Sequence, residues 1–197
     1  SGTYLSAKIM EDMVKSDYPD APLYIVDSKC ASIGYGLVVL HVAKMAKAGA
    51  SVEQIIEAAE YQAKHMEHLF TVDDLEYLYR GGRVSKTSAF VGGLLKIKPL
   101  LNVEDGRLVP IEKIRGSKKV LGRMIELMEE RGKDFQHQVI GISHGDDLER
   151  AEQLSSMIQD KFGVAKENIV IEMVGAVIGA HVGPGTLSLF FSNQPNK

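Results

Sequence analysis

The sequence predicts a mixed fold in two parts: a partial Rossmann-like parallel α/β domain over residues 1–70, then an α+β domain with antiparallel sheet and helices over residues 71–197. Two observations lead to this prediction. In the first part, a short apolar run lies among amphipathic helical patterns, which is typical of parallel sheets covered by helices. In the second part, a hairpin pattern precedes further helices and strands, which is typical of α+β folds.

The composition is that of an ordinary globular chain. Of the 197 residues, 45% are hydrophobic and 25% are charged, and the formal net charge is −3. The negative charge argues against nucleic acid as a partner, and no apolar run is long enough for stable membrane insertion. Cys30 is the only cysteine, which excludes an internal disulfide framework, and we expect a buried, inert thiol. We therefore expect a cytoplasmic protein.

The first part opens on a helical pattern. Ile9, Met10 and Val14 recur at helical spacing within residues 6–15, and the apolar run at residues 23–26 predicts a buried strand. Because the chain starts with Ser rather than Met and no strand precedes this helix, we expect that it begins inside a domain and lacks an upstream segment.

Two further helices are predicted before residue 70. Residues 37–48 form a largely apolar helical pattern that Gly49 ends. Ser51 and Gln54 have the spacing of a capping box for the next helix. The buried stripe of that helix comprises Ile55, Ile56, Ala59 and Ala63.

A hairpin is the clearest feature of the second part. Residues 96–103 alternate between apolar and polar side chains, which predicts a strand with one solvent-facing side. Residues 104–106 supply a turn into a second strand over residues 107–114. Pro99 and Pro110 within these strands indicate an edge strand or a bulge.

Helices and strands fill the rest of this part. A short helix is predicted over residues 73–79, before the hairpin. After the hairpin, the sequence predicts a helix capped by Ser117, a strand over residues 139–142, a helix over residues 148–158, and strands over residues 169–174 and 186–191.

A serine hydrolase motif occurs in this region. Residues 141–145 match G-x-S-x-G with Ser143 as the nucleophile, and Asp160 or Glu172, then His181, follow in the order of a catalytic triad. However, the flanking strands predict a small antiparallel layer rather than a large parallel sheet, and no HGGG-type oxyanion loop precedes the motif. A serine esterase using Ser143 and His181 is therefore a second hypothesis.

The sequence contains only weak patterns for a metal site and none for a nucleotide-binding loop. His65 and His68 have i, i+3 spacing, but no third ligand accompanies them, and a favourable interaction with the dipole at a helix C-terminus explains their position better. No G-x-x-x-x-G-K-[ST] loop is present, and Gly92 and Gly93 precede apolar residues instead. We expect no metal, no cofactor and no ATP site in this chain.

Three segments carry candidate binding residues. Ser1, Gly2 and Thr3 lie at a helix N-terminus, which suits either an anion such as a carboxylate or a simple N-cap. His181 lies in the glycine-rich residues 179–185, where the backbone can approach a ligand or another domain closely. The third segment is basic, and its cationic residues are Lys96, Lys98, Arg107, Lys113, Arg115, Lys118, Lys119 and Arg123.

Six motifs together resemble the successive signatures of the DegV family. They are SGTYLSA (residues 1–7), VDSK (26–29), RGGRVS (80–85), KPLL (98–101), IRGSKK (114–119) and GAHVGPG (179–185). The resemblance implies a two-domain protein that holds a long-chain fatty acid between its domains. It also implies a lipid-binding carrier without enzymatic activity of its own, which presents the carboxylate to a separate ATP-dependent fatty acid kinase subunit.

The resemblance also implies roles for single residues. Ser1, Gly2 and His181 would bind the fatty-acid carboxylate, Arg83 would lie near the interdomain entrance, and Arg115 would face the kinase subunit. The family's upstream segment, with a threonine that shares the carboxylate with the serine, has no counterpart in this sequence. DegV-type domains also resemble the dihydroxyacetone kinase fold, so a module that binds dihydroxyacetone or a phosphorylated sugar is a third hypothesis.

Overall fold

The computed structural model describes residues 2–85 and 97–195. In these residues one six-stranded sheet has the strand order β3-β2-β1-β6-β4-β5. The strands are β1 (Met66–Thr71), β2 (Ile97–Glu104), β3 (Arg107–Arg115), β4 (Ile140–His144), β5 (Ile169–Met173) and β6 (Leu187–Ser192). Only β4 and β5 pair in parallel among the described strands. The fold is therefore mixed α/β, as the sequence predicts. The parallel pairing expected over residues 1–70 is wrong for the described strands, because β1 pairs antiparallel with both of its neighbours and the parallel pair lies in the second part of the chain.

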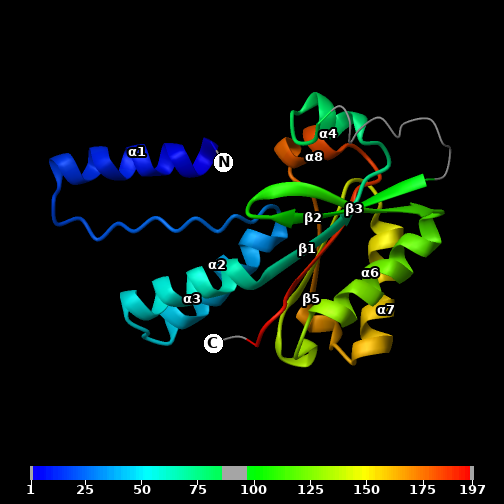
Figure 1. Cartoon of the computed structure of the whole chain (residues 1–197). Coiled ribbons are helices and arrows are strands. Elements are labelled where there is room, and N and C mark those ends of the chain that lie inside the picture. Colours follow the sequence, from blue (N-terminus) through cyan, green and yellow to red (C-terminus); the bar gives the residue numbers. More distant parts are fainter. Residues whose placement is uncertain (1, 86–96, 196–197) are drawn as a thin grey trace.

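Seven α-helices are described around this sheet (Figure 1). They are α1 (Gly2–Asp17), α2 (Ile33–Lys47), α3 (Val52–His65), α4 (Glu76–Arg80), α6 (Ser117–Arg131), α7 (Leu148–Phe162) and α8 (Ala176–Val182). Two short 3-10 helices, η1 (Phe135–His137) and η2 (Lys166–Asn168), connect them to strands. The predicted domain boundary at residue 70 falls within β1, which pairs with β2 and with β6. The division into two domains stays a prediction.

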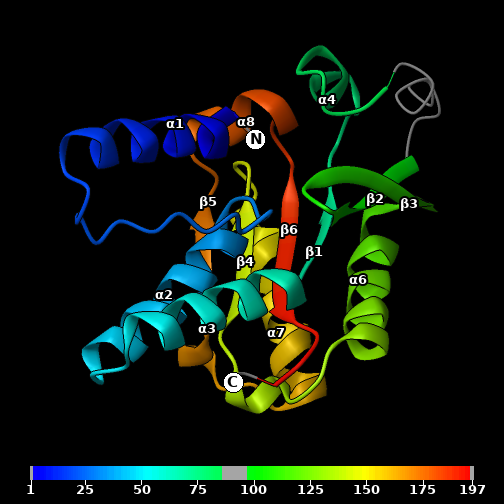
Figure 2. The same cartoon turned by 60° about the vertical axis from the view of Figure 1, so that its left-hand side comes forward.

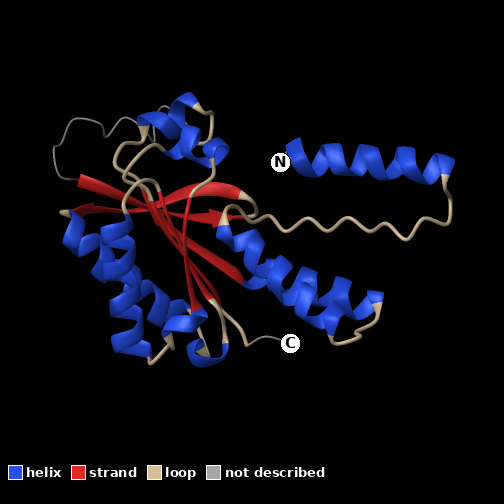
Figure 3. Cartoon of the chain, turned by 180° about the vertical axis from the view of Figure 1, so that it is seen from behind, coloured by secondary structure: helices blue, strands red, loops and turns tan. Residues whose placement is uncertain are grey.

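The largest core lies between one face of the sheet and the helices α6 and α7 (Figure 3). Leu187, Leu189 and Phe191 point to this face from β6, whereas Phe190 points to the other. This alternation follows the two-residue period of a strand. The helices contribute Met124 and Leu154, among others, and neither side chain is exposed to solvent.

Two smaller cores cover the opposite face. The pair α2 and α3 packs on the sheet through Leu37, Ala59 and Phe190, and Figure 2 shows both helices in front of β4 and β6. The pair α4 and α8 covers the other end of this face through Leu78 and Val182. The two ends of the sheet are therefore covered by different helices.

The hairpin forms as predicted, with one correction. Asp105 and Gly106 have φ values of 50° and 75°, which the two-residue turn of a twisted hairpin requires, and a register shift lies between Leu100 and Leu101. The solvent-facing side expected for the first strand is wrong: Leu100 and Leu101 are both 0% exposed. β2 is an inner strand, with Leu100 against the α6 and α7 core and Leu101 against α4 and α8.

Helix starts were predicted with mixed success. Ser51 and Gln54 form the capping box of α3 through both of its hydrogen bonds. Ser117, by contrast, is the first residue of α6 rather than its cap, and Gly116, with φ of 100° and ψ of 133°, holds the cap position. This backbone conformation, which residues with a side chain rarely adopt, turns the chain from β3 into α6.

The predicted strand at residues 23–26 does not form. Residues 19–31 link α1 to α2 without regular structure, because none of the described strands lies beside them to complete backbone hydrogen bonds. Helix α1 itself is set apart from the sheet in Figure 1. Its exposed apolar side chains are Leu5, Ile9, Met10 and Met13.

A buried histidine fastens this irregular segment to the sheet. The His68 Nε2 atom accepts a hydrogen bond of 3.3 Å from the Ala31 N–H, so Nδ1 carries the proton and donates to the Met66 carbonyl at 3.0 Å. Ser32 adds a contact of 3.1 Å between its hydroxyl and that of Ser143. Burial lowers the pKa of His68 from 6.5 to about 4, since the charged form of the ring would lose its hydration.

The His68 contact predicts a pH-dependent stability. Because the unfolded chain binds this proton more readily than the folded one, stability is full above about pH 6.5 and falls toward pH 4, by about 3 kcal/mol in total. We expect a smaller decline in His68→Gln. Urea unfolding of both proteins across this pH range measures the difference, and an equal decline in both would contradict the role of His68.

The α7 helix offers a matched test of the main core. Leu154 is 0% exposed and Leu148 is 51% exposed. We expect Leu154→Ala to lower the free energy of unfolding by about 2 to 5 kcal/mol, and Leu148→Ala to change it by less than about 0.5 kcal/mol. Denaturant unfolding measures both, and similar losses would show that α7 packs differently.

Candidate functional site

The helices α4 and α8 meet at one end of the sheet. α4 follows β1 and α8 precedes β6, and these two strands pair antiparallel with Thr71 opposite Leu187. The end of β1 and the start of β6 therefore lie at the same edge. Figure 1 shows the two helices packed together there, above the sheet.

His181 contacts α4 at a glycine. A Cβ atom added to Gly81 would lie 2.1 Å from the His181 Nδ1 atom, so the imidazole rests directly on the Gly81 backbone. From the other side, the Arg83 guanidinium donates a hydrogen bond of 2.6 Å to the Gly81 carbonyl. Two of the predicted site residues, Arg83 and His181, thus contact the same residue.

The turn after α8 is held by polar contacts. The Thr186 hydroxyl bridges the Val182 and Gly183 carbonyls at 3.1 and 3.0 Å, and Arg150 donates to the Gly185 carbonyl at 2.5 Å. The Gly185 N–H donates to Gly145 at 2.7 Å. These bonds fix the C-terminal end of α8, and with it His181, relative to the ends of β4 and β6.

An ionic cluster beneath this turn was not predicted. Lys98 contacts Asp73 at 2.6 Å, and Arg150 contacts Asp147 at 2.5 Å and Asp73 at 3.9 Å. Asp147 and Arg150 are three residues apart at the start of α7. Asp73 after β1, Lys98 in β2 and Arg150 in α7, by contrast, come together only in the assembled fold. Their types and spacing in the sequence carry no signal of this contact.

The structure places only one of the two N-terminal residues that are predicted to bind the carboxylate, Ser1 and Gly2. Ser1 lies outside the described residues. Gly2 is exposed at the first position of α1, and Figures 1 and 2 both show this end of α1 directed toward α8. The free N–H groups of a helix N-terminus and His181 therefore lie on the same side of the molecule.

Arg115 ends β3, two strands away from β1 but at the same edge of the sheet as α4 and α8. It is exposed, as are Lys118 and Lys119 in the first turn of α6. Arg123 does not belong to this surface, because its guanidinium contacts the carboxylates of Glu112, Glu126 and Glu130. The described basic surface is therefore narrower than the sequence indicates, and Lys96 lies outside the described residues.

The geometry of Ser143 does not fit a hydrolase. Ser143 lies within β4, opposite Glu172 and Ser188, and is 1% exposed. A nucleophile elbow instead places its serine on a sharp turn beyond the strand. The Ser143 hydroxyl contacts Ser32 rather than an imidazole.

The two histidines considered for metal binding have separate partners. His65 bonds Asn193 at 2.8 Å, and His68 is engaged by Ala31 and Met66. Within residues 2–85 and 97–195, no group of three or more histidine, cysteine, aspartate or glutamate residues could hold a metal ion. Burial raises the pKa of the Cys30 thiol to about 12, which disfavours the thiolate that a metal would need.

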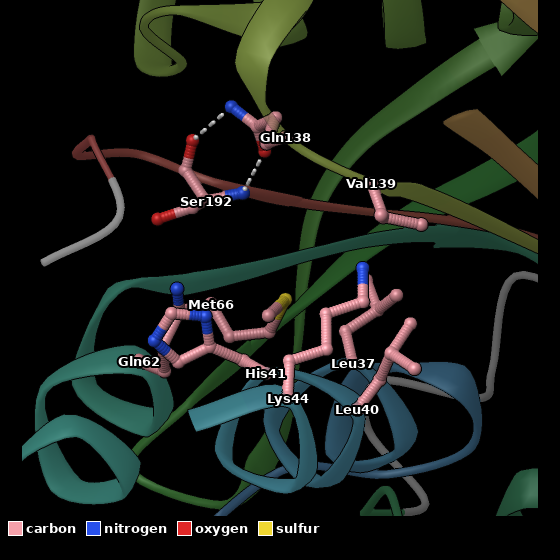
Figure 4. Close-up of a pocket in the computed structure, with 9 residues that line it drawn as sticks. All are labelled: Leu37, Leu40, His41, Lys44, Gln62, Met66, Gln138, Val139 and Ser192. Atoms are coloured by element: carbon pink, nitrogen blue, oxygen red, sulfur yellow. Dashed lines mark hydrogen bonds between the residues drawn. The ribbon is translucent and has the colours of Figure 1, made fainter. Parts of the chain in front are cut away.

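A small cavity lies at the other end of the sheet (Figure 4). Its volume is about 50 Å³, well below the roughly 300 to 1,000 Å³ of pockets that enclose drug-sized ligands. The lining residues are Leu37, Leu40, His41, Lys44, Gln62, Met66, Gln138, Val139 and Ser192. None of the predicted site residues is among them, so this cavity is separate from the contact around His181.

Comparison with known proteins decides the family. The family model described as "Uncharacterised protein, DegV family" matches residues 1–194. The chain belongs to the DegV family. A DegV domain-containing protein of Clostridium perfringens is 43% identical over 192 residues, which cover 97% of this chain and 65% of that protein. The chain thus spans about two thirds of the length of such relatives.

Solved DegV structures share this fold. The DegV of Bacillus subtilis, described as a fatty acid binding protein, has a TM-score of 0.79 and 34% identity over 96% of this chain and 66% of its own. The fatty acid kinase B3 protein of Streptococcus pneumoniae, loaded with linoleic acid, has a TM-score of 0.89 and 26% identity. The match covers 98% of this chain and 68% of that protein. Among the helices that the structure describes, none is both long and apolar enough to cross a bilayer.

Proposed function

We propose that this DegV protein binds a long-chain fatty acid with the carboxylate between the N-terminus of α1 and His181. The observation that carries the proposal is the placement of the start of α1 toward α8, with exposed apolar side chains on both helices, Leu5 and Ile9 on α1 and Val177 on α8. An anion-binding helix end surrounded by apolar surface matches a ligand with a charged head and an apolar tail. Ser1 and Gly2 complete the proposed head-group site.

The acyl tail supplies most of the affinity in this proposal. Each buried methylene contributes about 0.8 kcal/mol, so about 15 methylenes contribute on the order of 12 kcal/mol before the cost of association. The head group then needs only a few hydrogen bonds to fix its orientation. His181, an N–H group of α1 and Ser1 provide enough donors for a carboxylate.

The carboxylate is presented to a partner rather than transformed by this chain. A separate ATP-dependent kinase subunit would form the acyl phosphate in the cytoplasm, with Arg115 and its basic neighbours facing that subunit and Arg83 near the entrance between two domains. The linoleic acid in the fatty acid kinase B3 neighbour supports this proposal. So does the exposed position of Arg115 at the end of β3, on the sheet edge that also carries α4 and α8.

Native mass spectrometry tests the ligand. We expect the gently purified protein to carry a fatty acid, and the delipidated protein to take up palmitate or oleate. His181→Ala should weaken palmitate affinity about tenfold, since one hydrogen bond to a charged group contributes roughly 1.5 to 3 kcal/mol. His137→Ala is the matched control, because the His137 side chain is 77% exposed and bonds Asp134 on the surface. A protein that neither carries nor takes up a fatty acid would contradict the proposal.

A second test concerns the partner surface. We expect Arg115→Ala to leave palmitate affinity unchanged and to slow acyl-phosphate formation by an added kinase subunit, because Arg115 is exposed and charges at an interface govern association rates. Arg107→Ala, at the opposite end of the same strand, is the control. Loss of palmitate affinity in Arg115→Ala would show that Arg115 belongs to the lipid site.

A further inference from the structure

We infer that Gly81 is a positioning residue for His181. One edge of the His181 ring packs against Gly81 at the end of α4, and the opposite edge faces away from α4. The inference rests on the proposed function in one respect: it assigns the ring nitrogen that would meet the carboxylate. The contact itself is independent of any ligand.

Position 81 requires a glycine because of the close contact with His181 and not because of its backbone conformation. Gly81 has φ of −73° and ψ of −5°, which any L residue adopts. Its neighbour Gly82 has φ of 69° and does need glycine. An alanine at position 81 would therefore fit the chain locally, and the three atoms nearest to its methyl group would all belong to the imidazole of His181.

The contact also determines which edge of the imidazole is free. The atoms nearest to an added Cβ at Gly81 are Nδ1 at 2.1 Å, Cε1 at 3.0 Å and Cγ at 3.2 Å, all of His181. The Nδ1 edge is thus turned toward α4, and Nε2 lies on the far edge of the ring. We assign Nε2 as the atom that binds the carboxylate.

Arg83 and His181, the two predicted site residues near α4, both contact Gly81. The Arg83 guanidinium donates to the Gly81 carbonyl, while the His181 ring covers the Gly81 α-carbon. The chain reverses just after Gly81, since the Arg83 N–H donates to the Leu78 carbonyl at 2.8 Å. Displacing the ring would therefore alter the spacing between Arg83 and His181 as well.

A methyl group at position 81 would displace the ring. A separation of 2.1 Å is far shorter than ordinary van der Waals contact, which begins near 3.4 Å. The ring must shift by at least roughly 1 Å, and hydrogen bonds tolerate only about 2.7 to 3.2 Å between heavy atoms. Such a shift separates Nε2 from a carboxylate fixed by the N-terminus of α1.

A double-mutant cycle in palmitate affinity tests this role. We expect Gly81→Ala to weaken palmitate binding about tenfold, and to cause no further loss in a His181→Ala background. Gly179→Ala is the matched control on α8, because an added Cβ there meets only a Val174 methyl group at an ordinary 3.8 Å. Equal losses from Gly81→Ala in both backgrounds would overturn the inference, since the substitution would then act through the fold and not through His181.

A second measurement needs no ligand. In the lipid-free protein, we expect Gly81→Ala to shift the imidazole NMR signals of His181 while those of His137 stay unchanged. Gly179→Ala should move the His181 signals much less. If the protein fails to bind palmitate, the proposed function fails while shifted His181 signals still support the positioning role. Unchanged His181 signals in Gly81→Ala would overturn that role whatever the affinity.

Discussion

Backbone hydrogen bonds between β1 and β6 align six residue pairs, from Met66 opposite Ser192 to Thr71 opposite Leu187. This pairing joins segments more than 100 residues apart in the chain. Because the strands are antiparallel, the segment after β1 and the segment before β6 emerge at one edge, where Tyr77 on α4 and Gly183 after α8 come into contact. The His181 contact with Gly81 exists only because this register is kept, and the buried Leu69 and Leu189 on the α6 and α7 face hold it.

Local patterns in the sequence predicted the elements well. The hairpin turn at Asp105 and Gly106 and the capping box of Ser51 are confirmed, because short-range backbone geometry decides both. The strand at residues 23–26 was predicted wrongly for the complementary reason. An apolar run shows that a segment is suited to a strand, but pairing requires a neighbour, and none of the described strands supplies one.

The candidate site was predictable only as separate residues. Motifs singled out Arg83 and His181, but nothing in the sequence indicated that both contact Gly81, since that contact joins residues 100 positions apart. The ionic cluster of Asp73, Lys98 and Arg150 was missed for the same reason. The two glycines of the RGGR motif do indicate a close contact. Position 82 requires glycine for its φ of 69°, whereas the backbone at position 81 does not. Close packing is therefore the remaining reason for a glycine at position 81.

Three histidines show how environment separates structure from function. His68 is buried, and both of its ring nitrogens form hydrogen bonds with the backbone, which hold residues 19–31 against the sheet. Burial lowers its pKa to about 4. His65 is tied to Asn193. His181 is half-buried, with its Nδ1 edge packed on Gly81 and its Nε2 edge facing away from that contact. In the proposed lipid carrier, whose affinity would come mainly from the tail, the ring edge that faces away from Gly81 would determine where the carboxylate points. The α4 and α8 contact would then control where the carboxylate points, in addition to its smaller share of the affinity, and orientation is what a kinase subunit acting on the carboxylate would require.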